Sequence, residues 1–520
     1  MRITLVRSAL LLAVVSVAGL EAAGGNTVRL IDAVKAGNRT AIRTLIAQRA
    51  NVNSTEPDGM TALHYAVLGN DETVAQLLLK AGANVKAANR YGITPLKLAA
   101  ENGNPTLTDL LLKAGADANA ATPEGETVLM TAARTGNYSV IRSLVTSGAK
   151  VNSAEQWQGQ TPLMWAASQD NTEAVRALVE LGADKNARSK QLTFPEFKFE
   201  TSGMVVTVLP RGGWTALMYA ARDGAAGAVG MLADQKADLN LQDPDGTTAL
   251  MLAIINAHFD TAAVLIDKGA DPNVVDSTGT AALYAAVDMH TLGPMLSRPA
   301  PKLVDKLDAA DIVKMLLAKG GNPNARLKRP IIGRHHTPTG DASLGEGATA
   351  LARAAKSNDL ELMRMLFDAG ADPRLTLKDR TTVGMIASAG GAVVGAYAAA
   401  IPVTEASSLE ALKLCVQHGV DINAFNSNGG TALHSAAARG ANSLVTYLAE
   451  QGAKLDMKDK QGRTPLDVAL GVGGGAGRRG GGGGGGRGGA GRGNESTATL
   501  LRELLAKSGT PAPAVATGQP

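Results

Sequence analysis

The residues best suited to metal or acid–base chemistry lie together in one basic stretch, as Arg334, His335, His336 and Asp341. Adjacent histidines in an extended loop point to opposite sides, so they form a poor pair for one metal ion, unlike histidines four apart on a helix. No nucleophilic serine elbow, phosphate-binding loop or pair of zinc cysteines occurs elsewhere. We therefore favour a solvated basic loop, and the alternative is a metal-dependent hydrolase that uses residues 326–346.

Aromatic residues indicate a different chemistry, recognition of another protein. All three Trp residues, Trp157, Trp165 and Trp214, fall in one stretch with Phe197 and Phe199. Trp, Tyr and Arg often anchor interfaces, because each buries a large area and still offers a hydrogen bond or a charge. This stretch is therefore the main candidate for a binding surface.

The elements that position these residues repeat along the chain. A pattern Asp-Gly-x-Thr-Ala-Leu-His, clearest at residues 58–64, returns mostly at steps of 33 residues, and Arg380 once replaces its glycine. A period in this range indicates a solenoid of stacked repeats. The glycines that open the copies are Gly59, Gly92, Gly125, Gly159, Gly213, Gly246, Gly279, Gly347, Gly429 and Gly462.

Each repeat is predicted to contain two short helices. In the copy that opens at Gly59, apolar residues have helical spacing over residues 63–67 and again over 74–78. Thr61 is placed to cap the first helix, and Gly82 lies just past the second, where a left-handed residue closes the last turn. An extended loop, here called a finger, then leads to the next repeat.

The pattern resembles the ankyrin repeat family, whose unit carries a T-P-L-H-x-A-A run and a later G-A-D-x-N run. Residues 161–167 read Thr-Pro-Leu-Met-Trp-Ala-Ala and residues 182–186 read Gly-Ala-Asp-Lys-Asn, so one repeat shows both runs. The resemblance covers about residues 26–509 in twelve repeats, of which the first, at about 26–57, is a capping repeat. It implies an all-α solenoid of helix-turn-helix units that binds a protein partner, without catalysis and without a cofactor.

In ankyrin repeats the fingers and the ends of the first helices form the usual contact surface. Trp157 and Trp214 flank finger glycines, whereas Trp165 and Tyr219 occupy a helix position at which core packing is expected. Phe197 and Phe199, in an inserted stretch, are also candidates. The other predicted contact residues are Arg90, Tyr91, Ile93, Glu126, Arg134, Trp157, Gln160, Gln169, Trp214, Arg222 and Asp223.

Two further residue types have structural interpretations. His64 and His434 fall on the histidine of the family motif, where the resemblance implies a hydrogen bond to the repeat loop. Cys415 is the only cysteine, so it cannot form an internal disulfide, and its apolar surroundings predict burial.

The N-terminus predicts export. Residues 1–22 combine Arg2 and Arg7 with an apolar run over 9–20 and small residues near Ala18 and Ala22, which is typical of a cleaved secretory signal. The run is short for a membrane span, and an uncleaved anchor is the alternative. We expect a periplasmic or secreted protein that acts as a scaffold or accessory subunit, with an effector of another cell as a further alternative.

Insertions interrupt the repeat pattern. Residues 191–211 predict an extended β-hairpin between repeats five and six, and residues 326–346 a basic loop between repeats eight and nine. Residues 288–307 and 391–407 part the two helices of repeats eight and ten. The remaining segments are repeats at 26–190, 212–325 and 347–470, a Gly/Arg-rich loop at 471–493, a last helix at 494–509 and a tail at 510–520.

The Gly/Arg-rich loop carries the basic charge of the chain. The formal net charge is +4; removal of residues 1–22 leaves +3, and removal of the four Arg of residues 471–493 leaves −1. This segment and the tail are predicted to be disordered, because neither can bury enough apolar surface to fold. The loop resembles Arg-Gly segments that bind RNA but lacks aromatic residues, so we expect no specific nucleic acid, and weak polyanion contact is the alternative to a plain flexible insertion.

Overall fold

The computed structural model describes residues 29–192, 197–198, 205–206, 211–295, 305–329, 344–390, 397–399, 403–472 and 494–508. Within these residues, 24 helices pair into twelve repeats, which confirms the prediction of an all-α repeat protein. The chain divides into two compact units, unit 1 with residues 1–192 and 211–238, and unit 2 with residues 193–210 and 239–520. Unit 1 contains repeats one to six, and unit 2 contains repeats seven to twelve.

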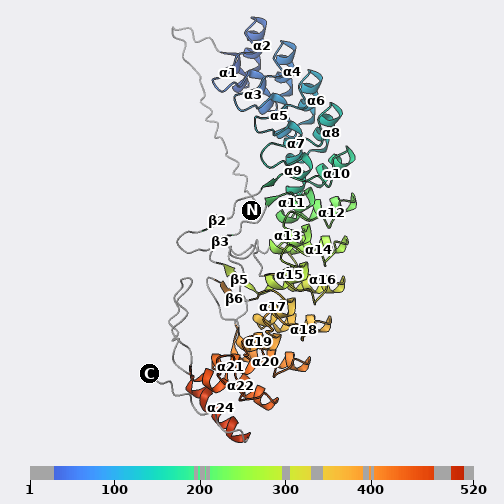
Figure 1. Cartoon of the computed structure of the whole chain (residues 1–520). Coiled ribbons are helices and arrows are strands. Elements are labelled where there is room, and N and C mark those ends of the chain that lie inside the picture. The colour runs from blue at the N-terminus through green and yellow to red at the C-terminus, as the bar shows by residue number, and fades with distance from the viewer. Residues whose placement is uncertain are drawn as a thin grey trace, which may run out of the picture. The chain divides into compact units, whose positions relative to one another are not determined.

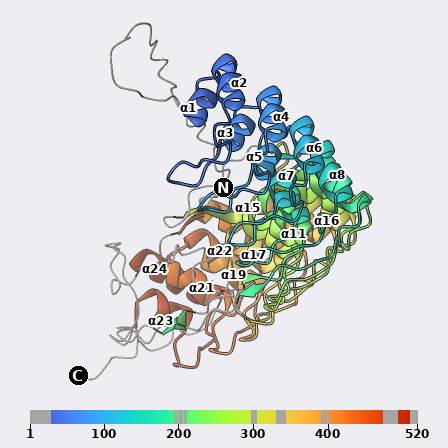
Figure 2. The same ribbon diagram turned by 90° about the horizontal axis from the view of Figure 1, so that it is seen from above.

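The helices of unit 1 are six to nine residues long. They are α1 (Leu30–Lys35), α2 (Arg39–Ala47), α3 (Ala62–Leu68), α4 (Glu72–Lys80), α5 (Pro95–Glu101), α6 (Pro105–Lys113), α7 (Val128–Thr135), α8 (Tyr138–Thr146), α9 (Pro162–Ser168), α10 (Thr172–Glu180), α11 (Ala216–Asp223) and α12 (Ala226–Asp234). Figure 2 shows α2, α4, α6 and α8 as a row outside α1, α3, α5 and α7. First helices pack on first helices, and second helices on second helices.

Unit 2 has the same two rows, and α13, α15 and α17 lie beside α14, α16 and α18 in Figure 1. Its helices are α13 (Ala249–Ile255), α14 (Phe259–Asp267), α15 (Ala282–Thr291), α16 (Ala309–Ala318), α17 (Ala350–Lys356), α18 (Leu360–Asp368), α19 (Val383–Ala389), α20 (Glu405–Gln417), α21 (Ala432–Arg439), α22 (Asn442–Glu450), α23 (Pro465–Ala469) and α24 (Glu495–Lys507). Small side chains such as Ala253 and Ala354 are fully buried, which lets neighbouring first helices approach closely.

The motif residues act as predicted at the helix ends. The Thr61 hydroxyl accepts from the backbone N–H of His64, and Gly82 has the left-handed φ of +88°. His64 Nδ1 lies 3.1 Å from the Thr61 backbone nitrogen, which can only donate, so Nε2–H donates to the Ile93 carbonyl at 3.0 Å. His434 repeats this arrangement with Thr431 and Arg463, so the predicted structural role of both histidines is confirmed.

Asparagines link successive repeats in a way that the sequence did not predict. Asn53 donates from Nδ2 to the Gly82 carbonyl at 3.1 Å and accepts at Oδ1 from the Asn84 backbone N–H at 2.7 Å. Asn152 makes the same two bonds to the next repeat, with Gly182 and Asp184. The asparagine therefore satisfies polar groups that a helix end leaves unpaired, which explains its place in the repeat.

A second series of backbone hydrogen bonds links most neighbouring fingers. In unit 1 the Arg90 backbone N–H donates to the Asp58 carbonyl at 2.9 Å. In unit 2 the Ser277 N–H donates to the Asp245 carbonyl at 2.8 Å, and the Lys460 N–H to the Asn428 carbonyl at 2.8 Å. These bonds fix the spacing between neighbouring fingers.

Short strands occur in the insertions. Antiparallel pairing of β1 (Gln191–Leu192) with β4 (Arg211–Gly212), and of β2 (Phe197–Lys198) with β3 (Val205–Val206), confirms the predicted hairpin. A further pair was not predicted: β5 (Leu292–Met295), which follows α15 in repeat eight, is antiparallel to β6 (Tyr397–Ala399) of repeat ten. Two insertions that were expected to be separate loops thus meet.

Two of these insertions are shorter than expected. Residue 288 was the predicted start of one, yet α15 continues to Thr291, and residue 407 was the predicted end of another, yet α20 already begins at Glu405. The first extension has a clear cause, because Asp288 is buried and bonded to Arg353 of the next repeat. The second reflects a capping box, in which Thr404 and Ser407 satisfy each other's backbone N–H groups.

A polar network runs through repeats eight to eleven. Arg353 Nε lies 2.5 Å from Asp288 Oδ1, and its Nη1 donates to the Ser357 hydroxyl at 3.0 Å. Ser408 accepts from Asn358 Nδ2 and from Arg439 Nη1, each at 2.6 Å. Polar side chains therefore link each of these four repeats to the next.

His290 should make the stability of unit 2 depend on pH. Its Nδ1 lies 2.6 Å from the buried Asp359 carboxylate, which holds the pKa of His290 above its usual 6.5, and Asp308 and Glu361 act in the same direction. A group with a raised pKa stabilises the fold fully below its unfolded-state pKa, and this stabilisation is lost as pH rises through the folded-state pKa. The stability advantage of the native chain over His290→Gln should therefore be present below about pH 6.5 and decline above it.

Melting temperatures of the two proteins across pH 5 to 9 would measure this difference. The melting temperature of the variant must be subtracted from that of the native chain at each pH. Burial lowers the pKa of His64 and of His434 in both proteins, and this changes their stability with pH in the opposite direction. Their contribution is lost as pH falls below about 6.5. A difference in melting temperature that stays constant with pH would contradict the assignment to His290.

Candidate functional site

Apart from Phe197, which lies on β2 of unit 2, the predicted contact residues in the described part of the chain lie in unit 1, on fingers and on the ends of first helices. Trp157 is the most exposed of them, with 76% of its surface accessible. Its finger is organised by Glu155, a buried carboxylate whose Oε1 accepts from the backbone N–H of Gln158 at 2.8 Å and of Gln160 at 2.9 Å. Oε2 accepts from the Trp157 N–H at 2.5 Å. A rigid loop therefore presents an exposed indole to solvent.

Cations lie over aromatic rings in the same part of the unit. The guanidinium of Arg90 is 4.7 Å from the ring centroid of Tyr91, which is 56% exposed. Arg134 is 5.6 Å from the ring of Trp165. Each such contact contributes about 0.5–1 kcal/mol at an exposed site. The pairing orders long side chains that would otherwise be mobile.

Trp214 is half-buried, not fully exposed, because it packs on its own repeat. Its ring meets that of Tyr219 edge to face, with centroids 5.4 Å apart, and Arg222 lies 5.2 Å from both rings. Arg222 also forms a two-pronged ion pair with Asp223, with both N···O distances at 2.7 Å. Tyr219 is buried, which confirms the prediction of core packing for it, whereas Trp165 at the same repeat position is only half-buried.

Sequence reasoning missed one pair of this kind in unit 1. The Lys35 ammonium lies 4.3 Å from the ring centroid of Tyr65. Tyr65 follows His64 in the first helix, at the position that Trp165 and Tyr219 hold in their repeats, and this alignment could have identified it. We call the set the cation–aromatic row; its members are Lys35 with Tyr65, Arg90 with Tyr91, Arg134 with Trp165, and Arg222 with Trp214 and Tyr219.

Glu126 has a structural role that the sequence did not indicate. Its Oε1 lies 2.7 Å from Nζ of Lys97, a buried lysine that stands at the motif histidine position. Burial opposes ionisation of Glu126, but the hydrogen bond and charge of Lys97 outweigh it and lower the pKa of the carboxyl. Thr131 Oγ1 also donates to Glu126 at 3.0 Å. Glu126 therefore neutralises a buried cation of its own chain.

The remaining predicted residues divide by exposure. Gln169 is exposed at the end of α9, whereas Ile93 and Gln160 are half-buried on their fingers. The side chains of Phe197 and Phe199 lie outside the described residues, as do His335, His336 and Asp341 of the basic stretch. So do residues 1–28, 473–493 and 509–520, on which the predictions of a signal, of a Gly/Arg-rich loop and of a tail fall.

The described residues carry no group of three or more His, Cys, Asp or Glu side chains placed to hold a metal ion. Cys415 is buried, as predicted, and burial raises the pKa of its thiol to about 12. None of the helices in the described part of the chain combines the length and apolar character that a membrane span requires.

A family model described as ankyrin repeats (3 copies) matches residues 30–122, 97–189, 200–292 and 397–474, which is more than half of the chain. A segment of 127 residues is 31% identical to cyclin-dependent kinase 4 inhibitor B of Bos taurus and covers 24% of this chain and 83% of that protein.

Two larger relatives match over a small share of their length. B-cell lymphoma 3 protein homolog of Mus musculus is 32% identical over 124 residues, 24% of each chain. Diacylglycerol kinase zeta of Rattus norvegicus is 32% identical over 128 residues, 24% of this chain but 12% of that protein. Among solved structures, the human ASB11 ankyrin repeat domain is 27% identical and covers 46% of this chain and 96% of that one, with a TM-score of 0.37.

Proposed function

Because the chain belongs to the ankyrin repeat family, a fold that typically binds proteins without catalysis, we propose that it is a non-catalytic binding protein whose unit 1 captures a protein partner. The observation that carries the proposal is Trp157, an indole 76% exposed at the tip of a finger. A large apolar side chain held in water is unfavourable unless it is covered in a complex. Trp is also the residue type most enriched at the energetic centres of interfaces.

Preorganisation supports the same surface. Three backbone hydrogen bonds to buried Glu155 fix the Trp157 finger, and each cation of the cation–aromatic row rests on a ring. Side chains ordered before association lose less conformational entropy on binding. The row thus supplies guanidinium groups for carboxylates and carbonyls of a partner, beside apolar area for its side chains.

The predicted contact residues would contribute to this surface in different ways. Trp157, Tyr91, Arg90 and Gln169 are exposed and would contact the partner directly. Arg134 and Arg222 contribute cations at the helix ends, with Asp223 orienting Arg222 through their ion pair. Glu126, held by Lys97, and half-buried Ile93, Gln160 and Trp214 would shape the surface.

We further propose that the chain acts outside the cytoplasm as a scaffold or accessory subunit. Support comes from the basic start, short apolar run and small residues of residues 1–22. Cleavage near Ala18 or Ala22 is decided by N-terminal sequencing of the exported chain.

Trp157→Ala should weaken binding of the native partner at least tenfold and leave the fold unchanged. A central interface Trp commonly contributes 2 kcal/mol or more, and 1.4 kcal/mol corresponds to a factor of ten. The exposed indole packs little within the chain, so the melting temperature should stay the same. The measurement is quantitative affinity capture from extracts of the producing cell, with both proteins as baits in parallel.

Arg176→Ala, on the second helix of the same repeat, is the matched control and should retain the partner. A photoreactive amino acid at position 157 should crosslink to the same protein, and one at position 176 should not. Equal retention by Trp157→Ala and the native chain would overturn the proposed surface.

A further inference from the structure

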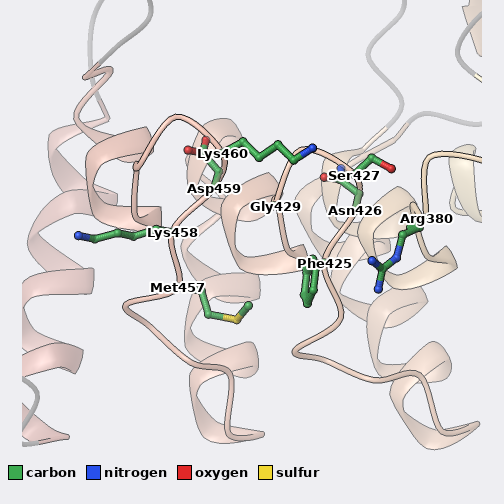
Figure 3. Close-up of a pocket in the computed structure, with 9 residues that line it drawn as sticks. All are labelled: Arg380, Phe425, Asn426, Ser427, Gly429, Met457, Lys458, Asp459 and Lys460. Atoms are coloured by element: carbon green, nitrogen blue, oxygen red, sulfur yellow. The ribbon is translucent and has the colours of Figure 1, made fainter.

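Unit 2 contains a recess on its fingers that none of the predicted contact residues lines. It has a volume of about 410 Å³ and lies across the fingers of repeats ten, eleven and twelve. Figure 3 shows Arg380, Phe425 and Met457 on the three successive fingers, with the guanidinium of Arg380 turned toward Phe425. Lys458 and Lys460 complete the basic part of the lining.

The apolar part of the recess is exposed. Phe425 is 44% accessible, one of four large apolar side chains among the described residues that stand out from the surface. Arg380 lies 4.8 Å from its ring centroid, and Met457 is half-buried beside the same recess. An aromatic ring and a thioether make a surface that adapts to apolar side chains of different shapes.

The charge of the recess is unbalanced. Asp459, its one carboxylate, is engaged by Arg463, with Oδ2 2.7 Å from Nη2, and accepts two further backbone N–H groups. Burial opposes ionisation of Asp459, but these bonds outweigh it and lower the pKa of the carboxyl. Arg380, Lys458 and Lys460 form no ion pair with any described residue. Three cations therefore face solvent without a counter-charge.

The left-handed backbone conformation of Arg380 indicates that its side chain has a function. The other motif fingers have glycine at this place, for example Gly347 at φ +92° and Gly429 at φ +77°, and Arg380 adopts φ +66°. This left-handed conformation is unfavourable for a residue with a Cβ. A strained residue that persists where glycine would fold without strain indicates that its side chain is needed.

We propose that this recess binds an acidic segment of a protein, which places an apolar side chain against Phe425 and Met457 and a carboxylate against the unpaired cations. Arg favours such a ligand, because its planar guanidinium forms two parallel hydrogen bonds with a carboxylate. A single-stranded nucleic acid fits less well, because its binding uses a series of exposed rings along a basic groove. The recess offers one ring, and Arg380 already lies over it.

The test selects peptides from a random twelve-residue display library on the full chain and then measures their binding by fluorescence anisotropy. We expect the selected peptides to combine Asp or Glu with an apolar residue. Arg380→Gly should weaken their binding at least tenfold, and higher salt should weaken their binding to the native chain. Because glycine is the residue that the backbone favours here, the melting temperature of Arg380→Gly should not fall, which separates a loss of binding from a loss of fold.

Lys454→Ala removes one exposed positive charge of repeat eleven outside the recess and should bind as the native chain does. Trp157→Ala should also bind normally, so this site can fail or succeed independently of the surface in unit 1. Peptides without acidic residues, equal binding by Arg380→Gly, the absence of any enrichment, or tighter binding of oligothymidine would each overturn the proposal.

Discussion

Asp288→Ala should lower the free energy of unfolding of unit 2 by about 3–5 kcal/mol, the usual consequence of removing one partner of a buried ion pair. The side chains of Asp288 and Arg353 are only 1% and 7% exposed, and their N···O distance is 2.5 Å. Loss of the carboxylate removes an ion-pair partner of the buried guanidinium. Chemical denaturation monitored by circular dichroism would measure the change.

The part of unit 2 that Asp288→Ala destabilises can be measured separately. In a repeat protein, stability is the sum of local and nearest-neighbour terms, so amide hydrogen exchange should accelerate first in α15 and α17. The double variant Asp288→Ala with Arg353→Met should recover much of the loss, because it removes both charges. Asp368→Ala, an exposed residue of α18, should change stability by no more than about 0.5 kcal/mol. A similar effect of Asp288→Ala and Asp368→Ala would contradict the role of the pair.

Gly246→Ala should destabilise unit 2 by about 1–3 kcal/mol more than Gly269→Ala, by the usual magnitude of overpacking. Both glycines are left-handed, at φ +86° and +91°, so both substitutions introduce the same backbone strain. A Cβ on Gly246 would lie 2.9 Å from Cα of Asp276 in the next finger, whereas a Cβ on Gly269 meets nothing within 4 Å. The difference isolates the contact between neighbouring fingers.

Denaturation midpoints of the two variants would give this difference directly. The Ser277 N–H bond to the Asp245 carbonyl should break in Gly246→Ala, so the exchange protection of that amide should fall in this variant alone. Equal destabilisation by the two substitutions would show that finger spacing adapts at little energetic cost.

The sequence predicted the features that depend on local spacing. Helices, Thr61 as a cap and Gly82 as a left-handed residue follow from residues a few positions apart, and the structure confirms each. The hydrogen bond of His64 was implied by the family resemblance, and the structure shows it to the carbonyl of Ile93 in the next repeat. Burial of Tyr219 also followed, because its repeat position is apolar elsewhere.

Features that depend on contacts between repeats were not predictable in the same way. Glu126 was predicted as a contact residue, and only the structure shows that it also pairs with Lys97 of the preceding repeat. The roles of Asn53 and Asn152 needed the position of the next helix end. The sequence showed Arg380 as a replaced glycine. Its role in the recess became visible only with the positions of Phe425 and Met457 on two other fingers.

The strand pair of β5 and β6 changes how unit 2 should respond to mechanical load. In a plain stack each repeat touches only its neighbours, so a pulled chain unravels from its ends one repeat at a time. Here backbone hydrogen bonds join repeats eight and ten across repeat nine. Repeat nine, with α17 and α18, thus lies inside a closed loop of contacts, and it can be extended only after the strand pair is broken. This coupling between second neighbours makes the middle of unit 2 more resistant to extension than a plain stack of repeats.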